Sequence, residues 1–176
     1  MKTIIKSILR LLLTPWRRQR AKRDGVAVTD GRKEYPNDAL LGLVCSYLAQ
    51  GKDATILVKG YSMRPFLEHE RDKVVLTPVV KPLQVADAVL AEIAPGHYVL
   101  HRIIEISGEH VTLMGDGNVR GVEHCLKSDV RGLVTHYVRP LRTIPASDPS
   151  LQRRIRRWRR LLPIRRFLLL FYKATI

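Results

Sequence analysis

From residue 55 onward, the chain is a succession of short strand-like segments with no long helical pattern between them. Runs of β-branched and apolar residues separated by proline and glycine are typical of β-strands. The pattern predicts strands at 55–59, 73–77, 87–93, 97–107, 110–114 and 129–138. Strands that follow one another without intervening helices form antiparallel sheets. The sequence therefore predicts a mainly β fold built on a coiled antiparallel sheet.

Ahead of this sheet, the sequence predicts one helix over residues 37–50. Four apolar residues recur there at the spacing of one helical face: Leu40, Leu41, Val44 and Leu48. Residues 19–36 are polar and contain glycine and proline, so we expect a linker. The 176 residues suit a single compact domain. We place that domain at 37–142, with an N-terminal segment at 1–18 and a C-terminal segment at 150–176.

Basic residues gather at the two ends of the chain. Residues 1–23 hold eight Lys or Arg and residues 150–176 hold nine, with no acidic residue in either stretch. The central part is close to neutral, although the whole chain carries a formal net charge of +15. This asymmetry indicates that the ends, rather than the central domain, meet a polyanion.

The apolar residues between these charges favour an anionic membrane surface as the polyanion. In the C-terminal segment, one helical stripe runs between arginines: Leu151, Ile155, Trp158 and Leu162. Pro163 interrupts this pattern, and the apolar run at 167–172 is shorter than the about 20 residues that cross a bilayer. Residues 1–18 combine a similar stripe with basic residues. We therefore expect amphipathic helices at both ends and peripheral membrane association.

There are three other interpretations of the basic ends. An amphipathic helix can dock on its own domain, although the near-neutral centre of the chain offers few acids to receive it. No helix-turn-helix, zinc-finger spacing or RNA-binding aromatic motif accompanies the arginines, so nucleic acid is not expected. A secretory signal peptide is disfavoured because Arg10 interrupts the apolar stretch and no small-residue cleavage site follows.

Three residue types that together break acyl bonds lie at the edges of strand-like segments. Ser62 lies in the run GYSMRPFL, His101 in YVLHRIIEI and Asp116 in LMGDGN. A serine hydroxyl needs a base to remove its proton, an imidazole suits that task near neutral pH, and a carboxylate orients the imidazole. Taken singly, each run also has an ordinary structural explanation as a turn or a strand residue.

Taken in order, these runs and two others, VADAVLAEI and DVRGLVTHYVR, resemble the signal peptidase I superfamily, the membrane-associated serine peptidases related to self-cleaving repressor peptidases. The resemblance covers residues 54–139. Most bacterial members carry lysine where this chain has His101, so the chain resembles the histidine-type branch. The resemblance implies the peptidase fold of that family, with Ser62 as nucleophile, His101 as base and Asp116 as orienting acid.

Two positions depart from the pattern of that family. Members whose oxyanion hole uses a side-chain hydroxyl place it two residues before the nucleophile, where this chain has Gly60. Backbone groups of Gly60 and Ser62 would then stabilise the oxyanion. Some histidine-type members have a second acid about six residues after the first, where this chain has Val122. Glu123 follows directly and is a candidate second acid.

The remaining cysteines and histidines indicate no further site. Cys45 and Cys125 lie 80 residues apart without Cys-x-x-Cys spacing, so we expect neither a disulfide framework nor a metal site. The other histidines lack a comparable setting and are expected to be surface or structural residues: His69, His97, His110, His124 and His136. We therefore expect no metal and no organic cofactor.

The sequence thus predicts a membrane-associated serine endopeptidase that cleaves leader- or signal-type peptides or precursor proteins. Its substrate would lie along a sheet edge as an added strand. By resemblance, the residues before the cut would be small. The main alternative is a non-catalytic descendant that binds peptides in the same groove. A self-cleaving regulator is less favoured, because such repressors carry a DNA-reading domain and a lysine base.

Overall fold

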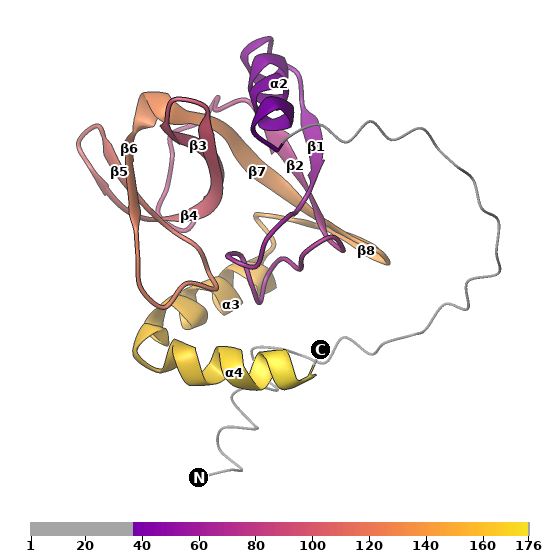
Figure 1. Cartoon of the computed structure of the whole chain (residues 1–176), viewed down its shortest axis with the longest axis vertical. Helices are drawn as coiled ribbons and strands as arrows, with labels where there is room; N and C mark the ends of the chain where they lie inside the picture. The colour runs from indigo at the N-terminus through magenta and orange to yellow at the C-terminus, as the bar shows by residue number, and fades with distance from the viewer. Residues whose placement is uncertain (1–36, 176) are drawn as a thin grey trace, which may run out of the picture.

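A computed structural model describes residues 37–175, to which every structural statement below refers. The predicted N-terminal segment and linker lie outside the described residues. Within them the chain forms one antiparallel sheet of eight strands, which is not closed, and three α-helices (Figure 1). The helices are α2 (Asn37–Ala49), α3 (Pro149–Arg160) and α4 (Arg165–Thr175). The strands are β1 (Ala54–Leu57), β2 (Lys73–Thr77), β3 (Ala88–Ala94), β4 (His97–Ser107), β5 (His110–Met114), β6 (Glu123–Leu126), β7 (Val130–Arg139) and β8 (Arg142–Pro145).

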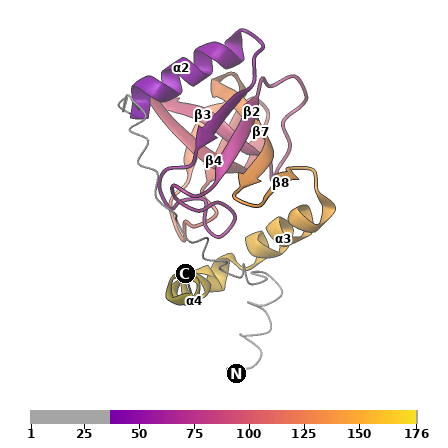
Figure 2. The same ribbon diagram turned by 90° about the vertical axis from the view of Figure 1, so that its right-hand side faces the viewer.

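The strands lie in the order β1-β2-β7-β3-β4-β5-β6, with β8 also paired to β7. Helix α2 covers one end of the sheet, whereas α3 and α4 lie at the opposite end (Figures 1 and 2). The mainly β prediction, the six predicted strands and the helix before them are confirmed, with ends shifted by no more than two residues. Strands β6 and β8 were not predicted. Their sequences, Glu-His-Cys-Leu and Arg-Thr-Ile-Pro, lack the run of β-branched and apolar residues that marks the other strands.

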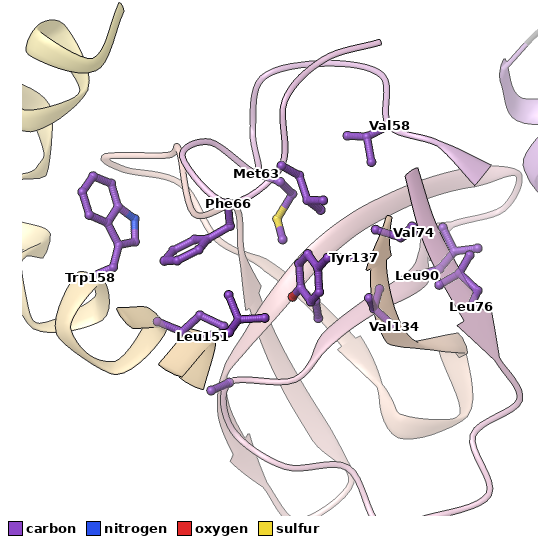
Figure 3. Packing of buried hydrophobic residues seen from close by; sticks show 14 of the residues in the cluster. Val58, Met63, Phe66, Val74, Leu76, Leu90, Val134, Tyr137, Leu151 and Trp158 are labelled. Atoms are coloured by element: carbon purple, nitrogen blue, oxygen red, sulfur yellow. The ribbon is translucent and has the colours of Figure 1, made fainter. Parts of the chain in front are cut away.

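Irregular pairing gives the sheet its coiled shape. The register shifts within β2–β7, β3–β4, β3–β7 and β4–β5. Such bulges bend a strand and increase its twist. The curled sheet encloses two buried apolar clusters, and the larger one reaches from the strands to α2 and α3. Figure 3 shows that Met63 and Phe66, from the loop after β1, enter this cluster between Trp158 and Tyr137.

Helix α3 docks on the domain through its apolar stripe. Leu151, Ile155 and Trp158 are all at most 2% exposed. The Trp158 indole N–H donates a 2.7 Å hydrogen bond to the carbonyl oxygen of Asp116, and its ring meets that of Phe66 edge-on. The expectation that these three side chains face a membrane is therefore wrong, because they lie inside the protein. Leu162, the fourth residue of the stripe, stays exposed.

Candidate active site

Ser62 lies on a loop between β1 and β2 that is anchored to the core by buried side chains. Met63, Phe66 and Leu67 follow Ser62 and are almost completely buried in the larger cluster. Gly60 precedes it with a φ of 91°, a conformation that glycine adopts without steric cost. The apolar anchors and this turn leave Ser62 half-buried at the surface of the domain.

The loop that carries Asp116 presses against the backbone of Ser62. The amide of Gly117 donates a 2.6 Å hydrogen bond to the carbonyl oxygen of Ser62. A Cβ atom on Gly115 would lie 2.5 Å from that oxygen and 3.0 Å from the Ser62 Cβ. Only glycine permits so close an approach of two backbones. The two glycines of this loop therefore fix the position of Ser62.

We expect Gly115→Ala to displace Ser62 and to lower the rate of any reaction at its hydroxyl by about 100-fold, the usual cost of misplacing a reacting group by about 1 Å. Gly121→Ala is a control elsewhere on the same connection, where a new Cβ meets nothing within 4 Å. Because Gly121 has a φ of 85°, the control should lose stability without losing specific activity. Equal specific activities of the two folded variants would contradict this assignment of Gly115.

Strand pairing places the Ser62 loop against the sheet face that carries His101. Arg102 on β4 pairs with Met114 on β5, so the register carried one residue further sets Gly115 beside His101. Directly paired residues project to the same face of a sheet. Because the Cβ direction of Gly115 leads to Ser62, the Ser62 loop lies against that face. The Ser62 hydroxyl makes no hydrogen bond to any residue of the described range, His101 included.

The carboxylate that contacts His101 comes from Glu123 on β6. The Nδ1 atom of His101 lies 2.8 Å from Oε2 of Glu123, and the imidazole is buried. A carboxylate at Nδ1 favours the tautomer with its proton on Nδ1, which leaves a lone pair on Nε2. Nε2 has no hydrogen-bond partner among residues 37–175. His101 is therefore arranged as a base with its accepting atom open.

Asp116 pairs with Arg102 instead of His101. Both oxygens of its carboxylate accept hydrogen bonds from the guanidinium, at 2.5 to 3.0 Å, and the two side chains are 3% and 1% exposed. Arg102 also donates to the carbonyl oxygen of Ala86 at 2.8 Å and to the hydroxyl of Tyr137 at 3.4 Å. Burial alone would lower the pKa of Arg102, but the Asp116 carboxylate raises it above its ordinary value.

Neighbouring residues on a strand project to opposite faces of the sheet, which explains why Arg102 and His101 contact different acids. Arg102 turns toward one face, where Asp116 meets it, and His101 turns toward the other, which carries the smaller buried cluster through Ile103 and Leu113. Of the two acids that sequence reasoning named, only the candidate second acid, Glu123, contacts the imidazole. Two strand pairings bring Glu123 near His101. Ile103, two residues after His101 on the same face, pairs with Leu113, and Leu113 pairs with Glu123.

Of the two backbone amides considered for an oxyanion, one is already engaged. The Gly60 amide donates a 3.1 Å hydrogen bond to Nδ1 of His69. The Ser62 amide has no partner within the described part of the chain. His69, expected to be a surface or structural residue, thus supports the loop, and its ring also packs edge-on against Tyr61. The Ser62 amide is the donor available to a ligand.

The other candidate groups add nothing to this site. Both cysteines are free thiols, and burial raises the pKa of Cys45 and of Cys125. Residues 37–175 contain no group of three or more metal-ligating side chains. No protein-family model matches the chain, and no curated protein sequence matches it.

Proposed function

We propose that this protein is a serine peptidase of the signal-peptidase type that cleaves leader- or signal-type peptides or precursor proteins. The observation that supports it most is the His101–Glu123 pair, which leaves Nε2 of His101 open on the sheet face against which Gly115 and the Ser62 loop meet. An imidazole that is held by a carboxylate at Nδ1 and has a free Nε2 is the kind of base that activates a serine hydroxyl. The resemblance of the surrounding runs to that family adds to this observation.

In the proposed mechanism, Nε2 of His101 accepts the Ser62 proton while Oγ attacks the scissile carbonyl. Glu123 stabilises the imidazolium, and the Ser62 amide donates to the oxyanion. His101 then gives its proton to the leaving amine, and water hydrolyses the acyl-enzyme. The missing Ser62–His101 hydrogen bond would form when a peptide binds, as catalytic hydrogen bonds often tighten only in the complex. Asp116 and Arg102 act by holding the loop that positions Ser62.

The alternative is a non-catalytic descendant that binds peptides at the same place. The absence of a hydrogen bond from the Ser62 hydroxyl to any described residue favours it. Incubating the full-length protein with a mixture of peptides of varied sequence, followed by mass spectrometry of new termini, separates the two. We expect cleavage products with the wild type and none with Ser62→Ala. Peptides that bind to the wild type but stay intact would establish the alternative.

For the location of the protein, we propose peripheral binding to an anionic membrane through the outer face of α4. Phe167, Leu170 and Phe171 are 62%, 58% and 50% exposed and recur at i, i+3 and i+4, so they share one helical face. Exposed arginines lie on and near the helix: Arg156, Arg157, Arg160 and Arg166. Exposed aromatic and apolar side chains among arginines are typical of interfacial helices. No helix within residues 37–175 is long and apolar enough to cross a bilayer.

We expect Phe167→Asp combined with Phe171→Asp to lower binding to vesicles that contain anionic lipid by at least tenfold. Each of these rings is a large apolar group that would enter the membrane interface, and an aspartate there would repel anionic headgroups. A vesicle sedimentation assay measures this binding. High salt should release only part of the wild type, because salt screens the arginines but not the apolar contact. Val80→Asp, at an apolar site 89% exposed outside the helices, is the control. Equal binding of the α4 variant and this control would contradict the assignment.

A further inference from the structure

Beside Ser62 lies a cavity of about 310 Å³ that the mechanism above does not use. One side is formed by the loop that carries Ser62 and by the loop that follows Asp116. The opposite side is helix α4, which contributes Arg166, Leu169, Leu170 and Tyr172. A segment about 100 residues from Ser62 along the chain thus completes a hollow at the candidate nucleophile.

Helix α4 is held in this position by specific contacts. The Tyr172 hydroxyl donates a 3.0 Å hydrogen bond to Glu68, which also binds the guanidinium of Arg64. At the start of the helix, buried Arg165 donates a 2.9 Å hydrogen bond to the carbonyl oxygen of Asn118. Leu168 is buried in the larger apolar cluster. Burial, together with the Glu68 carboxylate, raises the pKa of Tyr172. These contacts fix α4 in place as one wall of the cavity.

The lining combines apolar surface with positive charge. Val119, Leu169 and Leu170 supply aliphatic side chains, and none of the lining residues is acidic. Of the two lining arginines, Arg64 is committed to Glu68 and stacks on the ring of Tyr61 at 4.1 Å. Arg166 is exposed and has no hydrogen-bond or ion-pair partner within residues 37–175. The charge that remains for a ligand is therefore the guanidinium of Arg166.

We propose that this cavity is the specificity pocket of the protein and that it accepts a large apolar side chain from a peptide whose neighbouring residue is acidic. The volume is at the lower end of the range of ligand pockets, about 300 Å³, and so fits one or two side chains. The neighbouring carboxylate pairs with Arg166, since guanidinium and carboxylate match in geometry and charge. This inference rests on the proposed peptidase function. The large side chain that it assigns to the substrate differs from the small residues that the family resemblance implies.

Calorimetric binding of capped hexapeptides to full-length Ser62→Ala tests the pocket without requiring turnover. The probes carry Leu-Glu or Glu-Leu at their centre in an alanine background, and the comparison peptides replace leucine by alanine or glutamate by lysine. We expect leucine to bind about tenfold more tightly than alanine, from burial of its side chain. We expect glutamate to bind about fivefold more tightly than lysine, as for a partly exposed ion pair.

Charge reversal at Arg166 is the second part of this binding experiment. In the Ser62→Ala background, Arg166→Glu should prefer lysine to glutamate by about the same factor, while retaining the preference for leucine. Arg156→Glu changes an exposed arginine of α3 that does not line the cavity, so it should leave both preferences unchanged. Because Arg166 is exposed, its variant should melt at the temperature of the parent.

The outcomes separate the pocket from the proposed function. Selective binding without cleavage by the wild type would keep the pocket and remove the peptidase. Equal binding of leucine and alanine peptides, or an unchanged charge preference in Arg166→Glu, would overturn the pocket even if peptides are cleaved. Binding of dodecanoate that depends on Arg166, with no peptide binding, would assign the cavity to a lipid anion and equally overturn the proposal.

Discussion

Replacing either Ser62 or His101 by alanine should lower kcat/KM for peptide cleavage by at least about 10³-fold, and the double variant should be no worse than the poorer single one. Residues that act as one catalytic unit give strongly non-additive losses, because either change alone already disables the unit. Neither change should unfold the protein, since the Ser62 hydroxyl makes no hydrogen bond to a described residue and the imidazole contacts only one acid.

Steady-state cleavage of a peptide identified in the mixture assay measures these rates, with thermal unfolding as a check on the fold. His110→Ala is the matched control, because His110 is an exposed histidine on the neighbouring strand β5. It should keep full activity. Independent losses that multiply in the double variant would mean that Ser62 and His101 do not share a mechanism, and unchanged turnover in Ser62→Ala would end the peptidase proposal.

The second large effect distinguishes the two acids of the site. Glu123→Gln should lower kcat by about 10²- to 10⁴-fold, because an amide no longer fixes the productive tautomer of His101. Its effect on stability should be small, since Glu123 is a quarter exposed. Asp116→Asn should instead lower the free energy of unfolding by about 3–5 kcal/mol, because it leaves the buried Arg102 charge without its partner.

Denaturant unfolding and peptide cleavage, measured on the same preparations, separate these roles. Glu109→Gln is the control for loss of an acid, because Glu109 is 76% exposed and pairs only with Lys127 at the surface. It should change neither quantity. A stable Asp116→Asn protein that has lost turnover, together with an active Glu123→Gln protein, would return the orienting role to Asp116 as the family resemblance implies.

Much of the fold could be predicted because the strands of this chain are bounded by clear breaks. Pro78, Pro82 and Pro95 end or separate the segments that become β2, β3 and β4, and each segment shows strand-type composition. The Ser62 loop and the Asp116 turn were located by their runs of residues. Local signals of this kind do not depend on tertiary contacts, which is why they were sufficient.

The partner of His101 could not be predicted in the same way. Glu123 reaches the imidazole only through the register of β4, β5 and β6, and β6 has the short sequence Glu-His-Cys-Leu, without a strand pattern. Asp116 follows β5 after one residue, but the pairing of Arg102 with Asp116 depends on which side chains of β4 share a face with the Asp116 turn. Sequence spacing shows neither the strand register nor the face on which each side chain lies.

The C-terminal segment shows the same limit on a larger scale. Periodicity revealed that Leu151, Ile155 and Trp158 share a helical face, but a stripe that packs on a domain has the same period as one that binds lipid. The structure assigns this stripe to the core. The exposed apolar face belongs to α4, and its sequence, an almost continuous apolar run, gave no indication of which residues would point outward.

The central claim, that His101 held by Glu123 activates Ser62, is tested most directly by the rate at which a fluorophosphonate phosphonylates Ser62, whose Oγ bonds to phosphorus as fluoride leaves. Such a reagent needs an activated serine but no knowledge of the natural peptide. Intact-protein and peptide mass spectrometry at pH 7 should show one label per wild-type chain, on Ser62, with labelling at least about 100-fold slower in His101→Ala and Glu123→Gln. Labelling of Ser62 at the same rate in all three proteins, or no labelling of the wild type, would contradict the account.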